Sequence, residues 1–499
     1  MAVLPRPPSG NLRRDHGTVS AIVDPLSERD EPSPLGERVN LYGLDDRPPP
    51  VQTVVLALQH VLTMFGSTVA VPLLLGPAMG MGTPEVAVLI SSVMLCSGVA
   101  TLIQSTFGSR LPIIQGVSFS FLAAFFIIIG EIHAEGSGAT PGAAMPYIAG
   151  AVMAGAVLEM VVGFSGAMGF VRRLLSPVVV GPVIMLIGLA LYEAGAPVAA
   201  SHWPVSILTM TLIVLFSFVL SRRSAVFRLF PMLLAILGSV AVCGGLTATG
   251  VFGPDHPART DLSAFRDAAW VRGVDLVFPW GLPKFKLSFL VAVLAGYLAS
   301  MIESFGDYHA CKQMAGGGDP TEAEISRGIG CEGIGCALTG VLGGFSSTSY
   351  SENVGLIGLT RVGSRWVVQV GAVMLIALGV LGKFGALAAA IPKPVVGGLY
   401  CALFGLISAV GIRQFARADL ASDRNLFIGG FALFMGISVQ HYFKNGGAEA
   451  TIATLPGGVG EVVAAVGQTG MAVAAILGIA LDNLVPGTAA ERGLEIKTT

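Results

Sequence analysis

Apolar stretches recur along almost the whole chain and are separated by short polar loops. Most of them reach roughly the 17–25 residues that a helix needs to cross a lipid bilayer. This pattern predicts an all-α polytopic membrane protein. The predicted segments number fourteen and lie at residues 51–75, 84–106, 113–130, 144–164, 169–195, 204–220, 229–252, 289–314, 324–345, 349–361, 365–382, 384–410, 424–442 and 468–486.

Basic residues are concentrated in alternate short loops. The loops on the side of the N-terminal tail carry residues such as Arg110, Arg172 and Arg361, whereas the short loop 76–83 on the other side has none. Because Lys and Arg in short loops mark the cytoplasmic side, we expect both termini to be cytoplasmic in a plasma (inner) membrane protein. The long stretch 253–287 is then an extracellular loop.

A short motif occurs twice at matching places. Ser176-Pro-Val-Val-Val-Gly-Pro lies in the fifth segment, and Lys393-Pro-Val-Val-Gly-Gly lies in the twelfth. The third and tenth segments, which are both interrupted, are also seven segments apart. A repeat of seven crossings must be inverted in the membrane, and paired broken helices point to a substrate site near the midplane of a secondary transporter. We therefore predict two inverted seven-segment repeats with short extended stretches in segments three and ten.

The interrupted segments contain the first candidate binding groups. Pro112 and Gly116 break the third segment, and unpaired backbone at membrane depth is tolerated only where it is buried in protein or lines a cavity. In the tenth segment, Ser351 and Glu352 come at a helix start, where N–H groups and the helix dipole favour polar ligands. The alternative interpretation is that the Ser and Thr residues only cap a helix.

Several ionisable side chains lie inside apolar segments. Glu303 and Asp307 are four residues apart and share a helix face, Glu332 lies in the next segment, and His60 lies in the first. Such groups are costly at membrane depth and usually functional. A buried carboxyl group can also take up and release a proton near neutral pH. A structural network, or a helix–helix hydrogen bond from His60, is the alternative.

Composition supports a membrane bundle over a soluble protein. The chain is 53% hydrophobic and 12% charged, with a mean hydropathy of +0.75, whereas soluble chains average about 25% charged residues. A formal net charge of −2 argues against a nucleic-acid partner. The six cysteines show no paired spacing and are interpreted as small buried hydrophobes. Residues 1–50 lack apolar periodicity and are predicted to be a disordered cytoplasmic tail.

Three motifs that suggest other chemistry lack the context they need. Gly328-Ile-Gly-Cys-Glu-Gly333 fits a dinucleotide fingerprint, but no strand precedes it. Gly316-Gly-Gly-Asp319 resembles an intramembrane protease motif, but it lies in a loop before Pro320. His309 and Cys311 have no completing ligands for a metal. We therefore expect no cofactor and no metal.

The residues around position 352 resemble a known transporter signature. Glu352-Asn353-Val-Gly355, followed by Thr360-Arg361, is similar to the signature of the nucleobase–ascorbate transporter family, also called the nucleobase:cation symporter-2 family. Gln59-His60, Glu303-Ser-Phe-Gly-Asp307 and Gly363-Ser-Arg365 add to this resemblance. It covers about residues 50–490, so a transporter domain is expected at 51–490.

This resemblance implies two domains and a set of site residues. A core domain would hold about 51–165 and 289–382, and a gate domain, which also forms a homodimer contact, would hold about 169–252 and 384–486. Glu303 and Glu352 would bind the substrate, Phe119 would pack on its ring, and backbone N–H groups at Phe119 and Ser351 would meet its carbonyls. The full substrate-binding set is Glu303, Glu352, Phe119, Ser118, Ser351 and Asn353. The proton-coupling network is Glu303, Asp307, Glu332 and His60.

The implied function is symport of a nucleobase with a cation. Glu352 and Arg361 resemble uracil-type members, whereas Glu303-Ser-Phe-Gly-Asp-Tyr resembles purine-type members. We expect import of uracil coupled to protons, with xanthine or uric acid as the alternative. In an anion transporter of the same fold, neutral or basic groups would be expected in place of the midplane carboxylates. A membrane-embedded enzyme would need a nucleophile–base or metal constellation, which the sequence does not display.

Overall fold

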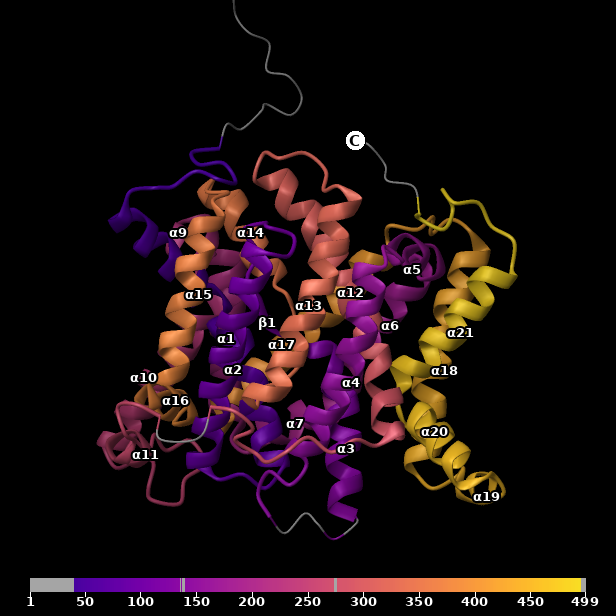
Figure 1. Ribbon diagram of the computed structural model, residues 1–499. Helices are drawn as coiled ribbons and strands as arrows, with labels where there is room; N and C mark the ends of the chain where they lie inside the picture. The colour runs from indigo at the N-terminus through magenta and orange to yellow at the C-terminus, as the bar shows by residue number, and fades with distance from the viewer. Residues whose placement is uncertain (1–39, 135, 137–139, 273–275, 495–499) are drawn as a thin grey trace, which may run out of the picture. The chain divides into compact units, whose positions relative to one another are not determined.

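The computed structural model describes residues 40–134, 136, 140–272 and 276–494 of the 499-residue chain. From Asn40 onward the chain forms one compact unit. It is built almost entirely from helices, as predicted (Figure 1). Residues 1–39, which make up most of the predicted tail, lie outside the described residues.

The elements of the first half run from α1 to α11 and include one short strand. They are α1 (Pro50–Ala78), α2 (Thr83–Thr106), β1 (Gln115–Val117), the 3-10 turn η1 (Phe119–Phe121), α3 (Leu122–Ala134), α4 (Met145–Phe164), α5 (Met168–Leu174), α6 (Pro177–Ala190), α7 (Tyr192–Ala200), α8 (Trp203–Val214), the π-helical turn η3 (Leu215–Val219), the 3-10 turn η4 (Leu220–Arg222), α9 (Ala225–Leu229), α10 (Pro231–Ala248) and α11 (Ser263–Asp267).

The second half runs from α12 to α21 and includes the other short strand. Its elements are α12 (Leu287–Met314), α13 (Glu322–Leu342), β2 (Ser347–Ser349), α14 (Ser351–Thr360), α15 (Arg365–Val380), α16 (Gly382–Ala389), α17 (Lys393–Phe415), α18 (Asp423–Lys444), α19 (Glu449–Ala453), α20 (Gly457–Gln468) and α21 (Gly470–Leu484).

Many of these helices are long and apolar enough to cross a membrane. Within the described ranges there are nine, or ten if α20 and α21, which meet at 92°, form one broken span. There are also two shorter apolar helices. Phe119–Ala134 belongs to the interrupted third segment, and Arg365–Val380 follows the interrupted tenth segment. These helices confirm a multi-pass membrane protein. The number of fourteen crossings remains a prediction, because several predicted segments are half-length helices.

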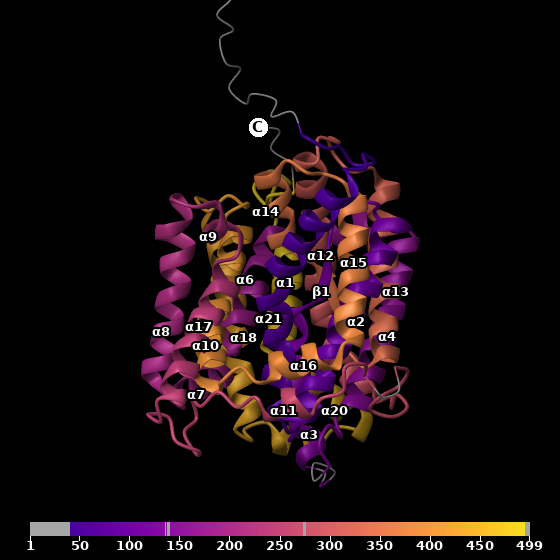
Figure 2. The same cartoon turned by 90° about the vertical axis from the view of Figure 1, so that its left-hand side faces the viewer.

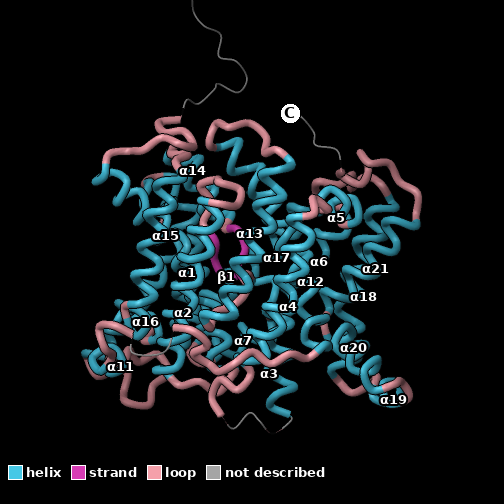
Figure 3. Tube along the Cα trace, viewed as in Figure 1, coloured by secondary structure: helices cyan, strands magenta, loops and turns pink. Residues whose placement is uncertain are grey.

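The two interrupted segments meet through a small antiparallel sheet (Figure 3). Gly116 lies under the ring of Tyr350, and a Cβ atom at this glycine would come within 2.3 Å of that ring. The close approach therefore depends on glycine at this position. The extended stretches predicted in segments three and ten are confirmed. The register pairs Gln115 with Ser349, Gly116 with Thr348 and Val117 with Ser347.

Two related motifs, Pro-Val-Val-Val-Gly and Pro-Val-Val-Gly, begin two equivalent helices. α6 starts at Pro177 and α17 starts at Lys393, with Pro394 in its first turn. Proline is accepted in the first turn but cannot continue a preceding helix. The predicted segment 384–410 is therefore split into α16 and α17, and the predicted segment 169–195 is split into α5, α6 and the start of α7. The apolar pattern alone did not reveal these breaks.

Small residues bring α6 and α17 into close antiparallel contact. A Cβ atom at Gly181 would meet Phe415 at 2.4 Å, and one at Gly188 would meet the backbone oxygen of Phe404 at the same distance. Such contacts between backbones are characteristic of helix packing in membranes. The two repeats are thus joined directly by their equivalent helices.

The last residues of the predicted tail are ordered against the transporter. The backbone N–H of Leu41 donates to Arg361 O at 2.9 Å, and Asp45 forms an ion pair with Arg365 at 2.6 Å. The Arg47 guanidinium lies 3.8 Å from the ring centre of Trp366. We call this side of the molecule the terminal face and the opposite side, which carries α11, the loop face (Figure 1).

Candidate functional site

The candidate site is built around the ends of the two strands. Figures 1 and 2 both place β1 beside α1, and α12 contacts both η1 and β2. Phe119 is the first residue of η1 and Ser351 is the first residue of α14. N–H groups at helix starts have no partner within their own helix. Two sets of backbone donors are therefore available where the two interrupted segments change from strand to helix at the centre of the bundle.

Phe119 and Ser118 have different roles in this arrangement. Ser118 is buried, and its hydroxyl accepts a hydrogen bond from Ser120 N at 3.3 Å, so it caps η1. Its backbone N–H donates to Ser346 O at 2.9 Å, which continues the pairing of the two broken segments. Phe119 is only partly buried and packs against the apolar core. The phenyl ring is thus the side chain that this segment can present to a ligand.

Glu303 and Asp307 lie on α12, as the four-residue spacing predicted. Asp307 Oδ1 accepts a hydrogen bond from Ser351 Oγ at 2.8 Å, which links α12 to the start of α14. Asp307 Oδ2 is buried and has no partner among the described residues. Glu303 lies within electrostatic range of Asp307, Glu352 and Glu332. The structure therefore brings the predicted carboxylates of three segments into one cluster.

Glu352 connects the second broken segment to α1. Its Oε1 accepts a hydrogen bond from Ser67 Oγ at 3.2 Å, and its side chain is exposed. One residue further along α1, Thr68 Oγ1 donates to the Tyr350 hydroxyl at 3.3 Å, and that hydroxyl donates to Val117 O at 3.0 Å. The hydrogen bond from Ser67 thus ties the exposed Glu352 carboxylate to α1. The neighbouring bonds of Tyr350 tie the start of α14 to α1 and to β1.

His60 and Asn353 form a buried pair. The Asn353 side-chain amide lies 3.0 Å from His60 O, to which it donates, and 3.1 Å from His60 Nδ1. Both side chains are buried, at 3% and 0% exposed. This contact fastens α14 to α1 and agrees with the structural alternative for His60. A role for either residue in binding substrate or carrying a proton stays a prediction.

Glu332 is the centre of a hydroxyl network behind the strands. Its Oε1 accepts from Ser300 Oγ at 3.1 Å and from Ser304 Oγ at 2.8 Å, while Oε2 accepts from the Tyr308 hydroxyl at 3.0 Å. Ser304 Oγ in turn accepts from Ser349 N at 3.3 Å. Glu332 therefore connects α13 and α12 to the backbone of β2. A change in the hydrogen bonding of Glu332 would alter the contacts of this strand, which borders the candidate site.

Glu159 on α4 is an ionisable residue that the sequence patterns above did not single out. It is 0% exposed, and neither carboxyl oxygen has a hydrogen-bond partner among the described residues. It lies within electrostatic range of Glu332 and Cys336. An ionised carboxylate without donors would be costly at this position. The signal was available in the sequence, because Glu159 is a lone acid within the apolar segment 144–164.

Comparison with known sequences gives a consistent set of relatives. The sequence model described as "Permease family" matches residues 51–445. Human "Solute carrier family 23 member 2" is 37% identical over 497 residues, covering 91% of this chain and 76% of the relative. Nucleobase-ascorbate transporter 7 of Arabidopsis thaliana is 36% identical over 431 residues, covering 83% of this chain and 80% of the relative.

Solved structures share the fold at much lower sequence identity. The transmembrane domain of the cyanobacterial bicarbonate transporter BicA superimposes with a TM-score of 0.52 at 16% identity, covering 78% of this chain and 95% of that domain. SLC26A9 gives the same TM-score at 11% identity, covering 78% of this chain and 62% of that protein. These likenesses concern the fold alone, and they agree with the predicted architecture of two inverted seven-segment repeats.

The relatives also indicate the broad class of activity. They are transporters rather than enzymes, and their similarity extends over nearly all of the described chain. The signature at Glu352 and Asn353 lies within the matched region. The chain therefore belongs to the permease family of nucleobase–ascorbate transporters.

Proposed function

We propose that this protein is a symporter that imports a nucleobase, with uracil as the first choice, together with protons. The observation that carries the proposal is the clustering of Glu303 and Glu352 beside the helix starts at Phe119 and Ser351. A planar base offers N–H groups to carboxylates, carbonyl groups to backbone donors and a face to an aromatic ring. These three kinds of group come together here.

Proton coupling is proposed for the carboxyl cluster and the network behind it. Asp307 contacts Ser351 at the start of α14, and Glu332 contacts the hydroxyls that hold β2. Loading a proton onto either group would change the hydrogen bonding of the segments that form the substrate site. Glu303 and His60 complete the proposed network. The same fold offers broken-helix backbone that could coordinate sodium, so the cation needs a direct test.

Other substrates have specific arguments for and against them. The mixture of uracil-type and purine-type motifs keeps xanthine and uric acid as the second choice. Ascorbate is also a candidate substrate, because the names of the plant relatives include both nucleobase and ascorbate. An anion close to Glu303 and Glu352 would be repelled unless a cation or proton accompanied it. The carboxyl cluster therefore favours a neutral base over a free anion.

We also propose the orientation and the assembly that the charge pattern and the family resemblance imply. The arginine-bearing terminal face would be cytoplasmic, and the loop face would be extracellular. The gate domain at 169–252 and 384–486 would form a homodimer in the plasma membrane, while the core domain at 51–165 and 289–382 would carry the site.

Uptake into proteoliposomes tests substrate and cation together. The purified protein would be reconstituted and offered labelled uracil, xanthine, uric acid and ascorbate in turn. Each would be measured with an imposed pH gradient, inside alkaline, and separately with a sodium gradient. We expect uracil to accumulate with the pH gradient and without sodium. Uptake that follows sodium and ignores pH would overturn the proton proposal, and accumulation of ascorbate alone would overturn the nucleobase proposal.

A further inference from the structure

Residues 40–47, which we call the strap, lie on the terminal face and pair with residues 361–365 between α14 and α15. Three backbone hydrogen bonds join the two segments, from Leu41 N to Arg361 O at 2.9 Å, from Gly363 N to Tyr42 O at 2.8 Å and from Arg365 N to Leu44 O at 3.0 Å. Tyr42 and Val362 form a parallel β-bridge within this pairing. The strap is therefore part of the folded transporter.

Side chains add to the contact between the strap and the start of α15. Asp45 forms its ion pair with Arg365, and the buried Ser364 hydroxyl donates to Asp46 O at 2.6 Å. Gly363-Ser-Arg365 is one of the motifs that carry the sequence resemblance. The structure thus gives this motif a contact with the strap, far from any group that would bind the substrate.

The strap also holds the turn that ends α14. Arg361 has a φ of 57°, a left-handed conformation that residues other than glycine rarely adopt. Such a conformation persists where the surrounding structure holds it. The Arg361 carbonyl is the acceptor for Leu41 N–H. Two residues further on, a Cβ atom at Gly363 would come within 2.8 Å of Ala315, so the connection passes directly against the end of α12.

The strap reaches the end of α12 as well. The Asn40 side-chain amide donates to the backbone oxygen of Met314, the last residue of α12, at 3.0 Å. Met314 lies beside α14, because a Cβ atom at Gly358 would be 3.2 Å from its sulfur. At the candidate site the same two helices are joined by the bond between Ser351 and Asp307. α12 and α14 are therefore joined at the site and again at the strap.

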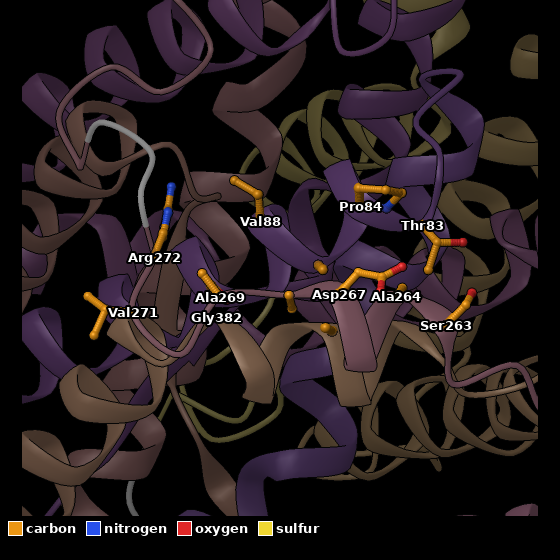
Figure 4. Close-up of a pocket in the computed structure, with 14 residues that line it drawn as sticks. Thr83, Pro84, Val88, Ser263, Ala264, Asp267, Ala269, Val271, Arg272 and Gly382 are labelled. Carbon is orange, nitrogen blue, oxygen red and sulfur yellow. The ribbon is translucent and has the colours of Figure 1, made fainter.

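α15 differs from α14 in having a second anchor on the loop face. There Arg272 N donates to Val380 O at 2.9 Å, and Gly382 N donates to Trp270 O at 3.1 Å. This anchor borders a cavity of about 540 Å³ between α2, α11 and α16, whose described lining includes no residue of the strap (Figure 4). Loss of the strap would therefore leave the far end of α15 in place.

α14 is short and begins at the candidate site. Its ten residues make a rigid element about 15 Å long, with Ser351 and Glu352 at one end and the strap contact at the other. Release of the strap end would let α14 pivot about its start and move Glu352 relative to Glu303 on α12. Binding groups need to lie within about 0.5 Å of their productive geometry. A small tilt of α14 is therefore enough to disturb the site.

We propose that the strap positions α14 against α12 and thereby sets the distance between the carboxyl groups of Glu303 and Glu352 for the substrate. This role rests on the proposed function, because both carboxyl groups belong to the proposed nucleobase site. The strap residues touch no substrate themselves and act as positioning residues.

Hydrogen–deuterium exchange of the purified full-length protein tests the strap without relying on transport. One variant replaces residues 40–47 with a Gly-Ser linker of the same length, and the control replaces residues 32–39 in the same way. In the strap variant we expect faster exchange in α14, at 351–360, while 372–380 of α15 exchange as in the unsubstituted protein. The control should match the unsubstituted protein throughout. Unchanged exchange at 351–360 in the strap variant would overturn the proposal, whatever the protein transports.

Uptake of labelled uracil tests the connection between the strap and the site. The strap variant should raise KM about tenfold or more, because misplaced groups bind less well, and keep the maximal rate within about twofold. The control should keep both values. Faster exchange in α14 with an unchanged KM would overturn the proposed effect on the site. If the unsubstituted protein takes up no uracil, the proposed function fails, and the exchange result alone decides whether the strap holds α14.

Charge exchange provides a milder test if the linker variant does not fold. Arg365→Asp places two carboxylates opposite each other, and Asp45→Arg combined with Arg365→Asp restores a pair of opposite charges. We expect KM to rise about two- to fivefold in the single variant, in keeping with a partly exposed ion pair, and to recover in the double variant. Exchange at 351–360 should follow the same order. Equal KM values in the single and double variants would mean that Arg365 acts without the strap, which would overturn the proposal.

Discussion

The two broken segments have similar backbones and different chemistry. In the first half, the segment at β1 and η1 offers the ring of Phe119 and backbone donors, while its Ser118 hydroxyl is used to cap η1. In the second half, the segment at β2 and α14 offers Ser351 and Glu352, and α12 adds Glu303 beside them. One half thus provides an apolar face, and the other provides nearly all of the ionisable groups.

This difference shows what an inverted repeat does and does not duplicate. The repeat doubles the scaffold, because both halves need a helix start near the midplane and a short strand that pairs with its partner. A ligand such as a planar base is not symmetric, since it has a flat face and a polar edge. The side chains of the two halves can therefore diverge while the backbones remain equivalent. The following substitutions would break or sharpen this comparison.

The largest effect is expected from the ionisable half. Glu303→Gln should abolish accumulation of the substrate while leaving the protein folded in the membrane. Loss of one buried charge-assisted hydrogen bond costs about 1.5–3 kcal/mol, or about ten- to a hundredfold in affinity. The measurement is labelled-base uptake, normalised to protein in the membrane. Glu322→Gln, an exposed acid at the start of α13, is the control. Near-normal uptake by a well-expressed Glu303→Gln protein would refute the assignment.

The next effect is expected from the aromatic half. Phe119→Ala should weaken binding more than Phe119→Tyr, because Tyr keeps the ring that we propose packs on the base. Aromatic stacking on a base contributes about 1–3 kcal/mol, so the Ala variant should lose about five- to a hundredfold in affinity. Competition constants for unlabelled uracil measure this difference. Phe126→Ala, another partly buried ring on the same broken segment, controls for lost packing. Equal constants for the Ala and Tyr variants would make Phe119 ordinary core packing.

Glu352→Gln should change the choice of base more than the rate. A carboxylate only accepts hydrogen bonds, whereas an amide both accepts and donates. Xanthine should therefore gain relative to uracil, because a bound base that covers the Glu352 side chain would leave mismatched polar groups without partners, and such mismatches discriminate strongly. The measurement is inhibition of uptake by unlabelled uracil, xanthine and uric acid. An unchanged rank order in a functional variant would mean that Glu352 does not contact the edge of the base.

The smallest effect is expected at Glu159, the buried carboxyl group of the apolar half. Glu159→Gln preserves shape, and an amide resembles a protonated carboxyl group in having both an acceptor and a donor. Uptake should remain within about twofold, a change of only a few tenths of a kcal/mol. The matched comparison is Glu332→Gln, which alters the network around β2 and should reduce the response to a pH gradient. Complete loss of uptake in Glu159→Gln would show that the first half also supplies essential ionisable chemistry.

Local sequence by itself determined the helices and the interruption of the third segment. Apolar runs of bilayer length predicted the helices, and Pro112 and Gly116 predicted the break in the third segment. The four-residue spacing of Glu303 and Asp307 predicted that they share a face of one helix, and the structure places both on α12. These features follow from periodicity and from residues that cannot continue a helix, and both act over a few neighbouring positions.

Only the tertiary structure decided which polar groups have partners. Glu332 is satisfied by hydroxyls from α12, whereas Glu159, which is equally buried, has no partner among the described residues. The pairing of β1 with β2, and the contact of Gly116 with Tyr350, join residues more than 200 positions apart. No local pattern contains that information, because hydrogen bonding and burial depend on which distant segments the fold brings together.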